Sequence, residues 1–185
     1  MNENKNPWTI LSSREIYDNP WIRLTEHQVL NPNGRPGIYG VVHFHHLAIG
    51  VVPYEDGKIW MVGQYRFPME AFSWEIPEGG GRLGIDPLDS AKRELQEETG
   101  LEADHYEVLL EMDLSNSVSD ERAIVYLAKG LHPGEASPED TEELHLRQMT
   151  LAEAYQLVEQ RVIRDSLTVA AIYKMRILEL QGMLG

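Results

Sequence analysis

The first half of the chain alternates between apolar and polar residues with the two-residue period of β-strands. Two such runs, 8–17 and 21–30, are separated by Asp18-Asn19-Pro20, a sequence typical of turns. A second turn signal, Asn31-Pro32-Asn33-Gly34, ends the second run. The same criteria predict further strands at 38–46, 47–54, 58–66, 104–114, 122–129 and 143–149.

Three segments carry helical signals. Asp86 followed by Pro87 predicts a helix start, and Gly100 predicts a left-handed stop, so a helix is expected over 87–99. A second helix is expected over 151–160 after Thr150 as N-cap, and a third after Asp165, through residue 180. This order predicts an α+β fold with helices on the faces of a sheet. We expect residues 1–40 to form an N-terminal strand extension that serves dimerisation and 41–185 to form the main domain.

Composition restricts the possible partners. The formal net charge of −14 argues against nucleic acid and against an anionic membrane surface. The chain has no cysteine, and its first residues lack the apolar core of a signal peptide, so we expect a cytoplasmic protein. An acidic enzyme that acts on a phosphorylated substrate needs a local cation, either a metal or an arginine.

The helix expected over 87–99 carries a cluster of carboxylates. At about 100° per residue, Glu94 and Glu98 lie roughly 40° apart, and Glu97 lies about 60° from Glu94. All three follow a glycine-rich loop that includes Gly79 and Gly80. Oxygen ligands of this kind suit Mg²⁺, which also neutralises their mutual repulsion. A solvated acidic helix face is the simpler alternative for the glutamates taken alone.

Other candidate groups have weaker support. His43, His45 and His46 suggest zinc, but no further ligand pair with suitable spacing is present, so hydrogen-bonded or solvated histidines are favoured. Trp21, like Trp8 and Tyr17, either stacks on a base or packs in an interface; packing is the more general expectation.

The segment from Gly79 to Leu101 resembles the Nudix box. Gly79 matches the opening glycine, and Arg93-Glu94-Leu95-Gln96-Glu97-Glu98-Thr99-Gly100-Leu101 matches the second half at every position. One position departs, because Ile85 stands where the family has its first glutamate. We expect weakened or retuned metal binding as the consequence, with Asp86 or Asp89 as substitutes. The segments 64–68 and 74–79 are similar to those preceding the box in the nucleoside diphosphate-sugar and ADP-ribose pyrophosphatase branch.

The resemblance implies an α/β/α sandwich with a mixed β-sheet, usually as a homodimer whose N-terminal strands contribute to the partner's site. It also implies hydrolysis of a diphosphate bond, assisted by Mg²⁺ with Mn²⁺ as a possible substitute, to a nucleoside monophosphate and a sugar phosphate. Glu94, Glu98 and Glu97 are then the metal ligands, joined by the backbone carbonyl of Glu78. Arg93 is expected to orient a glutamate.

Substrate contacts are also expected outside the helix. Arg66 is a candidate for the phosphate, because a guanidinium matches phosphate oxygens, and Glu75 for the ribose or diphosphate side. A surface arginine and a structural salt bridge are the respective alternatives. Gly79, Gly80 and Trp21 complete the predicted substrate-binding set. The resemblance leaves the general base open between a glutamate of the box and a glutamate of a distal loop. Glu142 and Glu143 are the candidates for the loop residue, and a solvated acidic loop is the alternative for each.

The sequence alone does not identify the substrate. The ADP-ribose subgroup carries a proline at a set distance beyond the box, whereas this chain has none between Leu101 and Pro133. This favours another nucleotide sugar, such as GDP-mannose, without excluding ADP-ribose. The alternatives are a non-catalytic nucleotide-sugar sensor with the Nudix fold and an enzyme that cleans the nucleoside triphosphate pool.

Overall fold

The computed structural model describes residues 5–134 and 143–184, which fall into two compact units. The first unit contains the chain up to residue 46 together with 113–122, and the second contains 47–112 and the chain from 123 onward. Each unit is described by itself.

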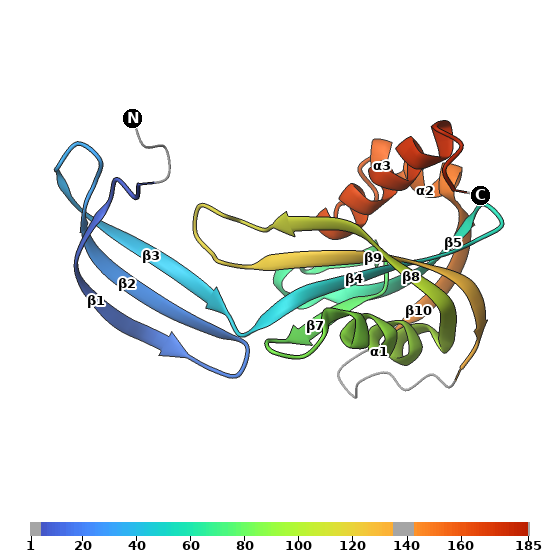
Figure 1. Ribbon diagram of the computed structural model, residues 1–185, viewed down its shortest axis with the longest axis horizontal. Helices are drawn as coiled ribbons and strands as arrows, with labels where there is room; N and C mark the ends of the chain where they lie inside the picture. Colours follow the sequence, from blue (N-terminus) through green and yellow to red (C-terminus); the bar gives the residue numbers. More distant parts are fainter. Residues whose placement is uncertain (1–4, 135–142, 185) are drawn as a thin grey trace. The chain divides into compact units, whose positions relative to one another are not determined.

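The first unit is built on a three-stranded antiparallel sheet of neighbouring strands, drawn in blue in Figure 1: β1 (Thr9–Asp18), β2 (Ile22–Leu30) and β3 (Pro36–Phe44). Segment 113–122 of the same unit runs beside β3. Val42 donates its amide to the carbonyl of Val118 at 2.8 Å, and Asp120 accepts from the amide of Phe44 at 3.0 Å. A backbone hydrogen bond and a hydrogen bond to the Asp120 side chain thus hold this segment on the small sheet.

The second unit contains a seven-stranded mixed sheet. Five strands follow the order β10-β5-β4-β9-β8, while β6 pairs with β5 and β7 pairs with β4. The pairing of β4 with β9 is parallel, and the pairings of β5 with β4, β6 and β10 are antiparallel. The strand bounds are β4 (His46–Glu55), β5 (Lys58–Arg66), β6 (Ala71–Glu75), β7 (Glu78–Arg82), β8 (Leu101–Asp113), β9 (Arg122–Pro133) and β10 (His145–Thr150).

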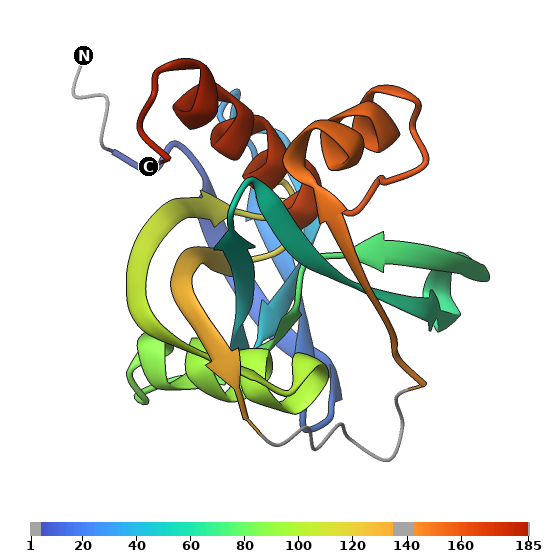
Figure 2. The same cartoon turned by 90° about the vertical axis from the view of Figure 1, so that its right-hand side faces the viewer.

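Helices cover both faces of this sheet. In Figures 1 and 2, α1 (Pro87–Thr99) lies on one side, and α2 (Leu151–Glu159) and α3 (Ser166–Leu180) lie on the other. A short 3₁₀ helix, η1 (Phe67–Met69), follows β5. The predicted α+β fold with a mixed sheet and an N-terminal strand extension is confirmed, and the second unit has the layers of an α/β/α sandwich.

Successive residues of β4 point to opposite faces of the sheet, so this strand contacts both helix layers. Ile49 and Val51 are fully buried in one cluster with Ala91 and Leu95 of α1. The intervening Gly50 faces the opposite layer, where a Cβ atom would come within 2.8 Å of Ile76 and 3.4 Å of Leu167. The absence of a side chain at Gly50 therefore allows α3 to pack closely against the sheet.

Among the described residues, no helix has both the length and the apolar character needed to cross a membrane.

Candidate active site

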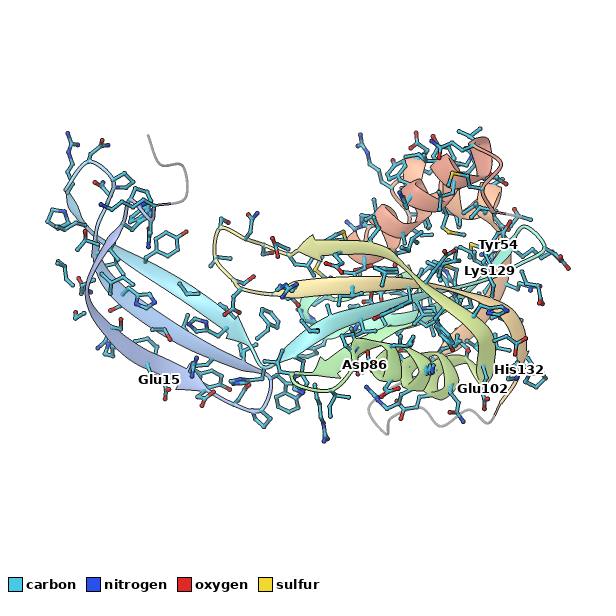
Figure 3. All side chains as sticks on the ribbon, in the orientation of Figure 1. Glu15, Tyr54, Asp86, Glu102, Lys129 and His132 are labelled. Carbon is cyan, nitrogen blue, oxygen red and sulfur yellow. The ribbon has the colours of Figure 1, made fainter. Side chains whose placement is uncertain are left out.

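Both ends of α1 are fixed by its own sequence. The side chain of Asp86, labelled in Figure 3, accepts a hydrogen bond from the amide of Leu88 at 3.0 Å, and Pro87 follows at the first helical position. Gly100 adopts φ 67° and donates its amide to the carbonyl of Gln96 at 2.9 Å. The buried apolar side chains of Ala91 and Leu95 set the rotation of the helix against the sheet.

The rotation of α1 brings two of the predicted metal ligands into the interior. Glu94 is 6% exposed and Glu98 is 4% exposed, whereas Glu97 is partly buried. Burial of a carboxylate is costly unless hydrogen bonds or opposite charges compensate it. Glu98 Oε2 accepts from the amide of Glu78 at 3.0 Å, so this carboxylate is joined to the start of β7.

Gly79 is the residue that permits this close packing. A Cβ atom at this position would lie 2.3 Å from the carboxylate carbon of Glu94, which is far inside van der Waals contact. The space beside Gly79 is thus occupied by the Glu94 carboxylate. Glu94 and Glu98 thus both lie beside the backbone of residues 78–79. Carboxylate oxygens are the ligands that a hard divalent cation prefers, so these residues fit the metal that the resemblance implies.

Arg93 ties the carboxylates to the glycine-rich loop. Its guanidinium donates to Glu97 and Glu94, and Nη2 also donates to the carbonyl of Gly80 at 3.0 Å. Burial lowers the pKa of Arg93, but the charges of Glu94 and Glu97 outweigh burial and raise the pKa above its usual value. The guanidinium stays charged and orients both glutamates.

Ile85, which replaces the first glutamate of the Nudix box, exposes a hydrophobic side chain to solvent. It is 52% exposed, and its amide donates to the carbonyl of Arg82 at 3.2 Å. Of the two residues expected to substitute, Asp86 uses its side chain as the helix cap, and Asp89 lies exposed in the first turn.

A second charged group lies next to the α1 carboxylates. Arg66 donates from Nε to Glu75 Oε2 at 2.9 Å, and from Nη2 to Glu75 Oε2 at 2.5 Å and Glu78 Oε1 at 2.6 Å. Glu75 is only 2% exposed, and Arg66 is the cation that pairs with it in the interior. If Arg66 contacts phosphate as predicted, its guanidinium has to bind the phosphate in addition to the carboxylates of Glu75 and Glu78.

Asp165, at the start of α3, joins this group from a distant part of the sequence. Carboxylate oxygens of Glu75, Glu78 and Asp165 lie within 4.8 Å of one another. Burial, followed by the charges of Asp165 and Glu75, raises the pKa of Glu78 well above its usual value. Glu78 Oε2 is buried and has no hydrogen-bond partner within the part of the chain that the structure describes.

These charged residues line a cavity of about 410 Å³. Arg164 from the α2–α3 connection, Ser166 at the start of α3 and Ser73 of β6 complete the polar lining. The apolar part of the lining consists of Pro68, Met69, Ala71, Phe72 and Val162. The sequence pattern identified Asp165 only as the residue before a helix and did not single out Arg164, because their proximity to Glu75 arises from the packing of α3.

The remaining predicted site residues are not brought into this group by the described contacts. Trp21 is 67% exposed and belongs to the N-terminal unit. Glu143 is exposed, and Glu142 lies outside the described residues. His43 forms a hydrogen bond with Asp120 at 2.6 Å and His45 with Asp18 at 3.0 Å, in line with hydrogen-bonded histidines.

A mixed sheet between helix layers, with a carboxylate-bearing helix packed on a glycine-rich loop, defines the Nudix class of proteins. Residues 44–169 match the NUDIX domain, and residues 8–42 match the nucleoside diphosphate sugar hydrolase N-terminal domain. The chain belongs to the Nudix hydrolase family, as the sequence predicts.

Several related proteins align with most of this chain. The methanol dehydrogenase activator of Bacillus methanolicus is 36% identical over 172 residues, which are 91% of this chain and 92% of that protein. An ADP-ribose pyrophosphatase of Bacillus subtilis (strain 168) is 34% identical over 172 residues, which are 91% of this chain and 92% of that protein. The crystal structure of an ADP compounds hydrolase has a TM-score of 0.87 at 21% identity, covering 99% of this chain and 100% of that one. This last likeness concerns the fold.

Proposed function

We propose that the protein hydrolyses the diphosphate bond of a nucleoside diphosphate sugar, using Mg²⁺, to a nucleoside monophosphate and a sugar phosphate. The observation that carries the proposal is the pair of buried carboxylates, Glu94 and Glu98, packed against Gly79 and joined to Glu78. Retaining these charges in the interior costs stability, and a binding site for a divalent cation accounts for that cost.

In this proposal, Glu94, Glu98, Glu97 and the carbonyl of Glu78 hold the metal. Mg²⁺, when bound, supplies stabilisation of the negative charge on the phosphate oxygens. Arg93 keeps Glu94 and Glu97 oriented through its hydrogen bonds to both carboxylates and to the carbonyl of Gly80. Glu142 and Glu143 remain the proposed candidates for the general base that takes the proton of the attacking water.

ADP-ribose is the first substrate that we propose to test. A relative that is 34% identical across 91% of this chain is an ADP-ribose pyrophosphatase, and the N-terminal match is to nucleoside diphosphate sugar hydrolases. The missing proline beyond the box is the reason to include GDP-mannose in the same panel. A nucleoside triphosphate tests the pool-cleaning alternative.

We also propose a cytoplasmic homodimer. Every residue of β1 is exposed in the single chain, including large apolar side chains such as Ile10, Leu11 and Ile16. Exposed apolar residues concentrated on one strand are typical of an interaction surface.

Glu98→Gln tests the proposed metal helix. The substitution keeps the size of the side chain and its acceptor oxygen but removes the charge, so kcat should fall on the order of 100-fold, which corresponds to about 2.7 kcal/mol of lost stabilisation. Glu107→Gln, at an exposed position of β8, is the matched control and should retain wild-type turnover.

The measurement is release of monophosphate products from the substrate panel at several Mg²⁺ concentrations. Undiminished turnover by Glu98→Gln would contradict the proposed role of α1. Binding of nucleotide sugars without turnover by the wild type would favour the sensor.

A further inference from the structure

The two guanidinium groups that line the cavity differ in what they already bind. Arg66 is engaged by two carboxylates, with Glu75 and Glu78 both within 2.6 Å of Nη2. Arg164 is exposed, and within the residues that the structure describes it has no ion pair and no side-chain hydrogen bond. A new anion that enters the cavity therefore meets one guanidinium that is not already neutralised.

The backbone that carries Arg164 is held in place on both sides. Ile163 before it is 1% exposed, and Asp165 after it caps α3 by accepting from the amide of Thr168 at 2.7 Å. Thr168 Oγ1 in turn accepts from the buried amide of Ile76 at 3.0 Å. The α2–α3 connection is thus tied to the strand segment that carries Glu75 and Glu78, and the freedom of Arg164 is confined to its side chain.

The cavity adjoins the α1 carboxylates through one residue. Glu78 donates its amide to Glu98 Oε2 at 3.0 Å, while its own side chain lines the cavity and accepts from Arg66. Glu78 is therefore shared between the α1 carboxylates and the cavity that Arg164 lines.

The charges of the cavity lining favour a phosphate-binding role for Arg164. The cavity wall carries Glu75, Glu78 and Asp165 against the single engaged guanidinium of Arg66. Such a wall repels phosphate, and the chain as a whole repels it too at a net charge of −14. A free guanidinium offsets this repulsion locally and matches two phosphate oxygens in its planar fork.

We infer that Arg164 is a substrate-binding residue that contacts a phosphate of the diphosphate where the substrate extends from the α1 carboxylates into the cavity. This inference rests on the proposed function, since it takes a diphosphate-linked compound as the ligand. It adds a contact from the α2–α3 connection to a site otherwise built from β5, β6, β7 and α1.

Arg164→Gln is the first test. We expect KM for ADP-ribose, or for the best substrate of the panel, to rise roughly 10- to 100-fold, the range that follows from losing a charge-assisted hydrogen bond. The change in kcat should be less than about threefold, because the α1 carboxylates are untouched. Arg164→Lys keeps the charge without the fork and should recover part of the loss.

The matched control is Arg161→Gln. Arg161 lies in the same connection and carries the same charge but does not line the cavity. Its KM should equal that of the wild type. An unchanged KM in Arg164→Gln would overturn the inference, and so would an equal rise in Arg161→Gln, because the effect would then be one of overall surface charge.

Calorimetric binding of ADP, with Mg²⁺ present, separates this inference from the proposed function. If the wild type hydrolyses no compound of the panel, the proposed function fails. The affinity for ADP then still tests whether Arg164 contacts a phosphate. A weaker affinity in Arg164→Gln than in Arg161→Gln supports the phosphate contact. Equal affinities of both variants and the wild type would overturn it.

Discussion

At the scale of single residues, the site depends on what is absent at Gly79 as much as on the glutamates. The missing Cβ leaves the space in which the Glu94 carboxylate lies, 2.3 Å from where that atom would be. The helical period alone predicts that Glu94 and Glu98 share a face, and the structure places both in the interior. Their burial is not a local property, because it follows from the packing of α1 on β4.

Gly79→Ala should disable the site while leaving the fold intact. The added methyl group displaces the Glu94 carboxylate, so we expect activity to fall about 10- to 100-fold, as for loss of a group that orients a metal ligand. The free energy of unfolding should drop by about 1–3 kcal/mol, the usual cost of overpacking.

Activity assays and urea denaturation measure the two effects of Gly79→Ala. Gly40→Ala is the control, because a Cβ at Gly40 has no neighbour within 4 Å and its φ is not positive. Wild-type activity in Gly79→Ala would show that Glu94 does not need this position.

At the scale of elements, the predicted strands and helices are present with small shifts at their ends. Helix 87–99 is found at the predicted bounds, since its cap, proline and terminal glycine are all local signals. Strands β6 and β7 were not predicted. Segment 78–82 contains three glycines and has no alternation, and it becomes a strand only because β4 offers it backbone partners.

The element contact that matters most for the cavity is the one between α3 and the β6–β7 segment. Thr168→Val keeps the shape of the side chain but leaves the buried amide of Ile76 without its acceptor, so the unfolding free energy should fall by about 1–3 kcal/mol. Hydrogen exchange at the Ile76 amide should accelerate as well.

Thr168→Ser is the control for that substitution, because it retains the hydroxyl group and removes only a methyl group, at a cost of about 0.8 kcal/mol. Denaturant titration and amide exchange followed by NMR give the comparison. Equal protection of the Ile76 amide in both variants would contradict the role assigned to the Thr168 hydroxyl.

At the scale of the whole molecule, the N-terminal unit lacks the burial that a stable layer needs. Within its described strands, Val29 is the one residue that is largely buried, at 3% exposure. An isolated three-stranded sheet gains stability when another surface covers its apolar residues. The proposed homodimer supplies such a surface.

Leu11→Glu should weaken that dimer. Leu11 is 58% exposed in the single chain, and burying a leucine contributes about 1.5–3 kcal/mol, so the dimer Kd should rise roughly 10- to 100-fold. Sedimentation equilibrium over a range of protein concentrations measures the change.

Val108→Glu, a similar exchange at a 52% exposed site on β8, serves as the comparison for Leu11→Glu and should leave association unchanged. A wild-type chain that sediments as a monomer of 21.1 kDa at all concentrations would contradict the proposed dimer.

The sequence by itself determined the α+β class, the position of α1 and the common face of its carboxylates, because caps, turns and helical periodicity depend on neighbouring residues. The tertiary structure decided which of those carboxylates are buried and which distant groups join them. Asp165 and Arg164 lie some ninety positions from Glu75 and share no pattern with it, so only the packing of α3 against the sheet brings them to the same cavity.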